Sequence, residues 1–216
     1  MEFLIESAST YAKDIDGIIE LIAWIVGPWF LLTFGIFIYF IFKFRKKEGV
    51  KALYIDGENP DHMKWISRPH AAVLLFDIVV VIVAIQVWNK VKIDLPEPDY
   101  TIGVVGHQWS WRFIHPGQDG KLGTADDIET VDELHVMVDK TYHFKLTSVD
   151  VLHSFSVPVF RLKQDAVPGR EITGWFNATK TGEFDIQCAE MCGIGHGIMG
   201  GRIHIATEAD HNKWIA

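Results

Sequence analysis

Cysteine is scarce in this chain of 216 residues, which contains only Cys188 and Cys192. Two cysteines cannot supply the several crosslinks of a disulfide-rich scaffold. The chain also lacks the Cys-x-x-Cys-His sequence to which c-type haem is attached, so we expect no haem in this chain. No internal repeat or low-complexity segment is visible, which argues against a solenoid or a disordered tail.

An excess of positive charge is missing from the second half of the chain. Residues 1–92 contain 10 basic and 10 acidic residues, whereas residues 93–216 contain 10 basic and 18 acidic ones. The net charge of −8 therefore lies entirely in the second half. Because phosphate is repelled by an acidic surface, we expect no nucleic-acid partner, and long-range attraction instead favours a basic protein partner.

Two long apolar runs stand out in the neutral first half. Residues 18–42 contain a single charge, Glu20, and residues 71–88 contain a single charge, Asp77. A helix of about 20 apolar residues crosses a bilayer, so the runs predict two transmembrane helices that form a hairpin. A buried soluble helix is the alternative for each run. A cleaved signal peptide fits poorly, because Glu2 and Glu6 stand where such a peptide carries basic residues.

The segment between the two runs is strongly basic and predicts the orientation of the anchor. Its positive residues are Lys43, Arg45, Lys46, Lys47, Lys51, Lys64 and Arg68. Positive loops stay in the cytoplasm, so we place residues 43–70 there and both termini outside. The chain then divides into an N-terminal tail and two-helix anchor, residues 1–92, and an extracytoplasmic domain, residues 93–216.

The outer half has the pattern of an all-β domain. Short segments rich in β-branched and aromatic residues, separated by Gly, Pro, Asp or Asn, predict strands at 101–113, 134–138, 142–149, 153–157, 171–178, 183–187 and 201–206. No amphipathic helical pattern occurs among them, which favours a sandwich or barrel. Residues 115–133 include an acidic irregular loop, which is either a solvated surface or a docking face for a basic partner. A calcium site there is disfavoured, because Lys121 and Gly123 replace oxygen ligands.

The chemistry is concentrated near the C-terminus, where Cys188, Cys192, His196 and Met199 follow one another closely. Thiolate, imidazole and thioether are soft ligands suited to copper, and two thiolates four residues apart can bridge two copper ions. Such a site needs a second imidazole, for which His153 is a candidate. A structural disulfide, a zinc site and, for His153, an ordinary buried histidine are the alternatives.

Four segments in a fixed order carry a resemblance to a known family. They are Gly-His-Gln-Trp-Ser-Trp at 106–111, Asp-Val-Leu-His-Ser-Phe at 150–155, residues 162–170, and the Cys-x₃-Cys-x₃-His-x₂-Met run at 188–199. Following a two-helix anchor, these segments resemble subunit II of the haem–copper cytochrome c oxidases over nearly the entire chain.

The resemblance implies a cupredoxin-like Greek-key sandwich that holds the dinuclear, mixed-valence copper centre called CuA. Its implied copper ligands are His153, Cys188, Cys192, His196, Met199 and the backbone carbonyl of Glu190. The side chain of Glu190 is implied to bind magnesium that is shared with the catalytic subunit.

The resemblance also implies roles around the centre. Trp109 matches the exposed aromatic residue through which a basic cytochrome c delivers its electron, with an ordinary strand aromatic as the alternative. For Trp111 we prefer the ordinary strand aromatic. Asp165 and Arg170 match positions near the haem propionates and the subunit interface, with a local turn ion pair as the alternative.

One departure from the family concerns the start of the second helix, where relatives carry a Glu shortly before a Trp near a proton pathway. Residues 62–70 contain no acid. Asp77 is the only ionisable residue within the second apolar run, and because charge is costly inside a membrane, we hypothesise a proton-related role for it. A polar contact to a neighbouring helix is the alternative.

The expected function is that of an electron-transfer subunit in an energy-transducing membrane, such as a bacterial inner membrane. It would accept electrons from cytochrome c and pass them to haem in catalytic subunit I, which, with other oxidase subunits, reduces oxygen and translocates protons. The rivals are a copper-free quinol oxidase subunit, the copper domain of a nitrous oxide reductase, and a non-redox assembly subunit with a Cys188–Cys192 disulfide.

Overall fold

The computed structural model describes residues 6–51 and 54–216. Glu2 of the N-terminal tail and residues 52 and 53 of the predicted cytoplasmic loop lie outside the described residues. The chain forms two compact units, one made of residues 6–15 together with Trp88–Ala216, and the other of Asp16–Val87.

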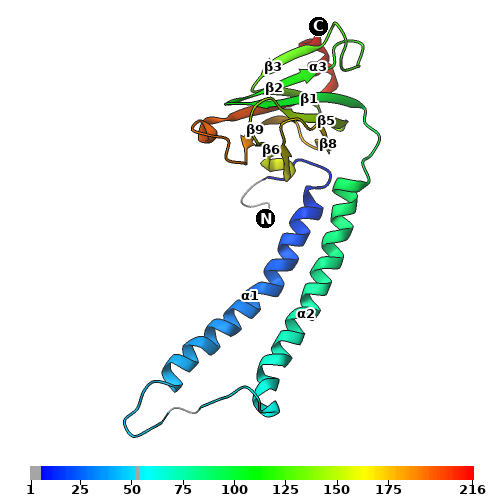
Figure 1. Ribbon diagram of the computed structural model, residues 1–216. Helices are drawn as coiled ribbons and strands as arrows, with labels where there is room; N and C mark the ends of the chain where they lie inside the picture. Colours follow the sequence, from blue (N-terminus) through cyan, green and yellow to red (C-terminus); the bar gives the residue numbers. More distant parts are fainter. Residues whose placement is uncertain (1–5, 52–53) are drawn as a thin grey trace. The chain divides into compact units, whose positions relative to one another are not determined.

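Two long apolar helices dominate the first half of the chain (Figure 1). Helix α1 covers Ala12–Lys43 and helix α2 covers Pro60–Trp88, after which a π-helical turn, η1, covers Asn89–Ile93. Both helices are long and apolar enough to cross a membrane, and none of their most apolar stretch is buried within the chain. The prediction of two long apolar helices is therefore confirmed. Each helix extends beyond the predicted apolar run into polar flanking residues.

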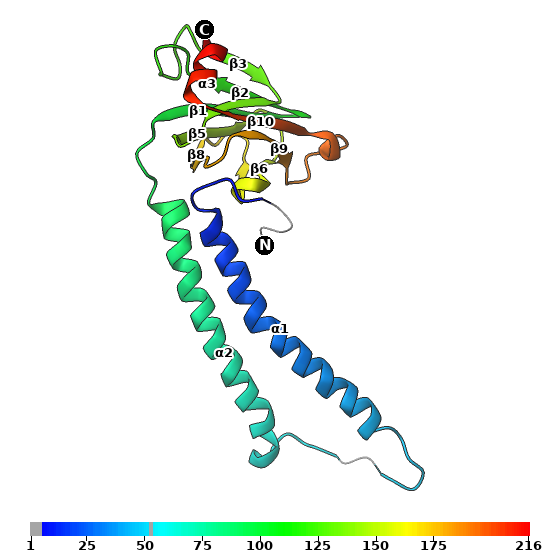
Figure 2. The same ribbon diagram turned by 180° about the vertical axis from the view of Figure 1, so that it is seen from behind.

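The outer unit is built from ten strands. These are β1 Tyr100–His107, β2 Ser110–His115, β3 Ile128–Val131, β4 Glu133–Met137, β5 Thr141–Ser148, β6 His153–Val157, β7 Leu162–Ala166, β8 Ile172–Asn177, β9 Gly182–Cys188 and β10 Gly200–Ala206. They form one sheet in the order β3-β2-β1-β5-β8 and another in the order β4-β10-β9-β6-β7. Two 3₁₀ turns, η2 Pro158–Phe160 and η3 His196–Ile198, and a terminal helix, α3 Glu208–Ile215, complete the unit (Figures 1 and 2).

Aromatic residues from both sheets fill the core. Trp111, Phe113, Phe144, Phe155 and Phe176 are all fully buried, and their rings contact one another in an edge-to-face or stacked manner. The alternating pattern of β5 places Tyr142, Phe144 and Leu146 on this inner face. Burial of these large side chains supplies the main stabilisation of the sandwich.

The residues before α1 also belong to the β unit. Ser9 forms a β-bridge with Ala178, and the Ala8 amide donates to the Val159 carbonyl at 2.8 Å. Tyr11 is 1% exposed and contacts the ring of Trp175. The first described residues therefore act as an additional strap on the sandwich, which the sequence pattern did not predict.

Several predicted segments need correction. Residues 101–113 form two strands, β1 and β2, because a turn at Gln108 and Trp109 interrupts them. Strands β3 and β7 were not predicted. Both lie at sheet edges, where charged side chains face solvent and hide the apolar alternation. The expected absence of a helix in this half is wrong as well, because α3 is present at its C-terminal end. Thr207 begins this helix as a cap, since its side chain accepts a hydrogen bond from the Asp210 amide.

Candidate metal centre

The ends of three elements meet at one rim of the sandwich. His153 is the first residue of β6, Cys188 is the last residue of β9, and Met199 precedes β10. Strands β6 and β9 are paired, with Phe155 opposite Cys188. The Cys188 amide donates to the Met199 carbonyl at 3.1 Å, which closes the loop between β9 and β10. The pairing of β6 with β9 and this hydrogen bond hold the loop next to His153.

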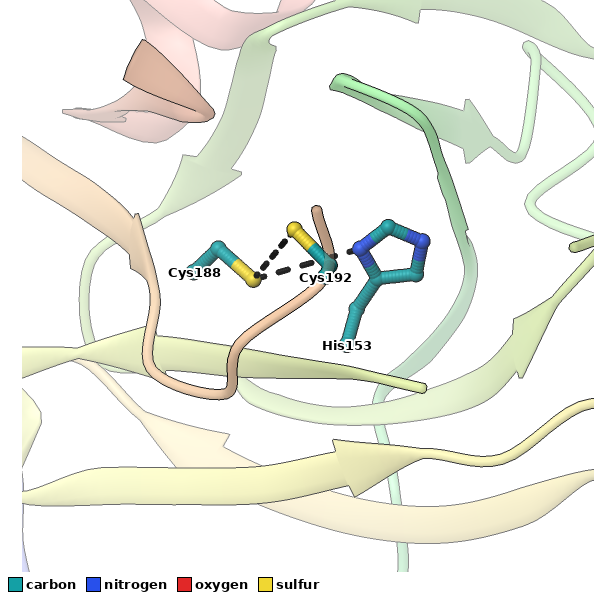
Figure 3. Close-up of side chains that lie close together, drawn as sticks. All are labelled: His153, Cys188 and Cys192. Carbon is teal, nitrogen blue, oxygen red and sulfur yellow. Dashed lines mark hydrogen bonds between the residues drawn. The ribbon is translucent and has the colours of Figure 1, made fainter. Parts of the chain in front are cut away.

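The donor atoms of five side chains form a continuous cluster, of which Figure 3 shows His153 and the two cysteines. The sulfurs of Cys188 and Cys192 are 3.7 Å apart, and Nδ1 of His153 is 3.9 Å from the Cys188 sulfur. On the other side, Nδ1 of His196 and Sδ of Met199 each lie 3.7 Å from the Cys192 sulfur. The cluster thus contains two sulfurs at its centre, each with an imidazole nitrogen beside it.

These separations suit metal ligands and exclude a disulfide in this structure. A disulfide has an S–S distance of about 2.05 Å, and both cysteines are free. Ligands about 2.0–2.3 Å from a tetrahedral ion lie roughly 3.3–3.8 Å from one another, which is close to the spacing found here. Two thiols, two imidazoles and a thioether form a soft donor set that fits copper.

Asp150 orients the His153 ring. Nε2 of His153 lies 2.8 Å from Oδ1 of Asp150, so this nitrogen donates and leaves the Nδ1 lone pair directed at Cys188. Burial favours the neutral form of Asp150, but hydrogen bonds from His153 and from the Gln108 and Val151 amides outweigh it and lower the pKa of Asp150 to about 2. The carboxylate is therefore charged at neutral pH.

The buried thiol of Cys192 holds its proton in the absence of a metal. Burial, together with the neighbouring Cys188, raises the pKa of Cys192 to about 11. The metal-binding form of cysteine is the thiolate, so binding of a metal must release protons from this site.

Trp109 connects the cluster to the surface. Its side chain is 38% exposed, and its indole N–H donates to the Cys192 carbonyl at 3.2 Å. Gln108 donates to the same carbonyl at 2.8 Å. A side chain at Gly195 would collide with the Trp109 ring, so glycine at this position allows the indole to lie directly on the loop. Trp111 is an aromatic residue of strand β2, as expected, and its side chain is buried in the core.

The other predicted residues occupy separate places. The Glu190 carbonyl lies 3.3 Å from the Cys188 sulfur, while its side chain is partly exposed. Asp165 of β7 lies opposite Ser154 of β6. Arg170 is exposed in the turn before β8. In the described part of the chain, Asp165 and Arg170 form no ion pair with each other. Asp77 is exposed on α2.

Sequence reasoning did not assign roles to Asp150, Gln108 and Gly195. The signal for Asp150 was an acid three residues before a candidate histidine ligand. The contacts of Gln108 and Gly195 join segments more than 80 residues apart, and no local pattern reports them.

The chain is similar in sequence to known proteins. A family model described as cytochrome c oxidase subunit II, periplasmic domain, matches residues 100–206. The alternative cytochrome c oxidase subunit 2 of Bradyrhizobium diazoefficiens is 33% identical over 230 residues, which cover 93% of this chain and 79% of that protein. The chain belongs to the cytochrome c oxidase subunit II family.

Other relatives show the same likeness. Cytochrome c oxidase subunit 2 of Cereibacter sphaeroides is 27% identical, with 97% of this chain and 77% of that protein covered. A probable cytochrome c oxidase subunit 2 of Rickettsia prowazekii is 36% identical over 64% of this chain, and the match spans about half of that relative, 49%.

The fold class is confirmed by a solved structure. The periplasmic domain of subunit II of cytochrome oxidase of Bradyrhizobium japonicum is 34% identical, with a TM-score of 0.50 over 56% of this chain and 94% of that chain. The β unit is therefore the cupredoxin-like sandwich of this family. Family membership makes the chain a membrane-anchored subunit of an oxidoreductase, with a β domain of the periplasmic type.

Proposed function

We propose that this subunit transfers electrons from cytochrome c to haem through a dinuclear copper centre of the CuA type. The observation that carries the proposal is the pair of cysteine sulfurs 3.7 Å apart, each beside an imidazole nitrogen. The proposed copper ligands are His153, Cys188, Cys192, His196, Met199 and the carbonyl oxygen of Glu190. Copper bound to this set supplies reversible one-electron chemistry, because soft thiolate ligands stabilise the reduced ion.

The protein frame serves this chemistry by holding the ligands still. His153 is 0% exposed and lies against Trp111 and Gly106, while Asp150 fixes its ring. Cys188 and Met199 are tied together through their backbones. Ligands that are fixed by packing and by hydrogen bonds need little rearrangement when the charge of the centre changes, which favours fast electron transfer.

Trp109 is the proposed entry point. Its ring reaches from the exposed surface to the Cys192 carbonyl, so a donor protein that contacts the indole is separated from a proposed ligand by one hydrogen bond. The acidic character of the outer domain attracts a basic cytochrome c over a long range. The loop between β2 and β3 is either part of that docking surface or an ordinary solvated loop.

The proposed exit leads to catalytic subunit I, whose haem accepts the electron for oxygen reduction coupled to proton translocation within the complete oxidase. The partly exposed side chain of Glu190 is suited to binding magnesium at that interface. Asp165 and the exposed Arg170 are proposed to face the haem propionates. We propose a proton-related role for Asp77, and unchanged turnover and proton pumping in Asp77→Asn would contradict it.

The rivals lack support from specific observations. A copper-free quinol oxidase subunit would lack the cysteine and histidine ligands, and all of them are present and close together. A disulfide-bonded assembly subunit requires bonded sulfurs, whereas these are 3.7 Å apart. A nitrous oxide reductase copper domain would not carry two such apolar helices.

Rapid mixing of the copper-loaded chain with reduced cytochrome c tests the proposal. We expect bleaching of the copper absorption at a rate that falls steeply with ionic strength. Trp109→Leu should slow this step at least about tenfold, since it removes the indole contact to the Cys192 carbonyl and leaves all proposed ligands in place. Trp24→Leu, an exposed tryptophan on α1, is the matched control. A copper-loaded chain that takes no electron from cytochrome c would contradict the proposal.

A further inference from the structure

A second cluster of donor side chains lies in the sheet β4-β10-β9 and takes no part in the function proposed above. His135 of β4 and His204 of β10 are register partners on neighbouring parallel strands. Their rings are stacked, with centroids 4.5 Å apart and an interplanar angle of 11°. Trp214 of α3 stacks on His135 at 4.1 Å, so the terminal helix holds this ring in place.

Glu133 completes a three-ligand arrangement. It lies two residues before His135 on β4, and alternate strand residues share one face of a sheet. Its Oε2 is 3.8 Å from Nε2 of His135, and one donor atom from each of Glu133, His135 and His204 lies within 4.8 Å of the others. Donors bound to one tetrahedral ion at about 2.1 Å lie roughly 3.4 Å apart, so binding requires these donors to approach one another, and the exposed side chain of Glu133 can rotate towards the two rings.

Glu183 of β9 orients His204. It is the register partner of His204, and its Oε1 lies 3.3 Å from Nδ1 of that ring. A carboxylate on one imidazole nitrogen is the usual means of directing the other nitrogen at a metal. Here the other nitrogen, Nε2 of His204, is buried and has no hydrogen-bond partner within the described part of the chain. A buried imidazole nitrogen without a partner is uncommon, and a bound ion would satisfy it.

We propose that Glu133, His135 and His204 bind a divalent transition-metal ion of the zinc class, with Glu183 as a positioning residue. Two imidazoles and one carboxylate are a typical three-ligand set for zinc, and a water molecule would occupy the open position. The set contains no sulfur, which distinguishes it from the cysteine cluster, and it contains too few oxygens for calcium.

The site is separate from the copper ligands and does not rest on the proposed function. His204 follows Met199 by five residues along β10, which corresponds to about 16 Å at roughly 3.3 Å per residue. An ion bound here would join the edge strand β4 to β10. Since it binds the folded chain only, it would raise the thermal stability of the β unit.

Zinc titration of the full chain in detergent tests this site. Cys188→Ser/Cys192→Ser removes the thiols, which would otherwise compete for zinc. We expect this double-serine variant to bind a single zinc ion. In that background, His135→Gln and His204→Gln should each weaken zinc binding by about a hundredfold, and Glu183→Gln should weaken it by about tenfold. His62→Gln, an exposed histidine of α2, is the matched control and should leave the affinity unchanged.

A second measurement covers the case in which the serine variant does not fold. Cobalt added to the copper-loaded native chain should give the visible bands of a nitrogen- and oxygen-ligated ion without thiolate charge transfer, and His204→Gln should abolish them. Absence of zinc or cobalt binding would overturn the proposal. So would binding that is equally strong in His135→Gln, His204→Gln and the control.

Discussion

At the scale of single residues, the proposed copper centre depends on side chains that are not ligands. Asp150 holds the His153 ring through a 2.8 Å hydrogen bond and also accepts the Gln108 amide at 2.7 Å. It therefore connects a ligand to the turn that carries Trp109. An aspartate in this position determines which nitrogen of His153 is free to bind a metal.

Asp150→Asn should weaken copper binding by about tenfold to a hundredfold, because an amide no longer attracts the His153 N–H as a carboxylate does. Competition with a copper chelator measures the affinity. Asp185→Asn, an exposed carboxylate on β9, serves as the control. Equal affinities in the native chain and the Asp150 variant would show that this orientation is unimportant.

His115 makes the stability of the β unit depend on pH. It is 2% exposed, and burial, only partly opposed by the Ile128 carbonyl, lowers its pKa to about 4, with His135 and His211 lowering it further. The unfolded chain takes up this proton near pH 6.5. Stability is therefore complete above about pH 6.5 and falls as the pH drops towards 4.

Between pH 7 and pH 5 this group should remove about 2 kcal/mol from the free energy of unfolding. Denaturant titrations of the full chain at the two pH values measure the change, and in His115→Gln most of it should disappear. Burial also lowers the pKa of His135 and His211, so a smaller dependence should persist. A pH effect of full size in His115→Gln would contradict the assignment.

At the scale of secondary structure, local patterns predicted some elements and not others. The alternation in β5 and the spacing of Cys188, Cys192, His196 and Met199 are local features, so both the strand and the loop ligands could be predicted. Edge strands β3 and β7 are short and contain the charged residues Glu129, Lys163 and Asp165, so their pattern resembles a loop. The contacts of Gln108 with Cys192, and of the segment before α1 with β8, depend on packing between distant parts of the chain.

The strap before α1 gives a test at this scale. Tyr11 is buried against Trp175, and its hydroxyl donates to the Trp175 carbonyl at 3.2 Å. Tyr11→Ala should lower the free energy of unfolding of the β unit by about 3–5 kcal/mol, as for other large aromatic residues in cores. Tyr11→Phe, which removes only the hydroxyl, should cost about 1 kcal/mol. Tyr54→Ala, at an exposed site, should have little effect. Unchanged stability in Tyr11→Ala would mean that the strap does not pack in solution.

At the scale of the whole molecule, the two halves of the chain differ in charge and in hydropathy. The neutral half holds the two apolar helices, and the acidic half holds the β sandwich with the proposed copper centre. The basic residues between the helices favour a cytoplasmic position for residues 43–70, with both termini on the opposite side.

Labelling of single cysteines tests this topology in intact cells. In the Cys188→Ser/Cys192→Ser background, Glu58→Cys should be protected from a membrane-impermeant maleimide, whereas Asp119→Cys should react with it. Both positions are exposed in the structure, so a difference in labelling reports the side of the membrane. Labelling of Glu58→Cys from outside would refute the predicted orientation.

We propose that the cluster of His153, Cys188, Cys192, His196 and Met199 holds a pair of copper ions that share one electron. Electron paramagnetic resonance of the copper-loaded full chain, with metal analysis of the same sample, tests it most directly. We predict two copper ions per chain and a hyperfine pattern from an electron spread equally over two copper nuclei, which Cys192→Ser abolishes. A signal from a single isolated copper ion, or a chain that binds no copper, would contradict the account.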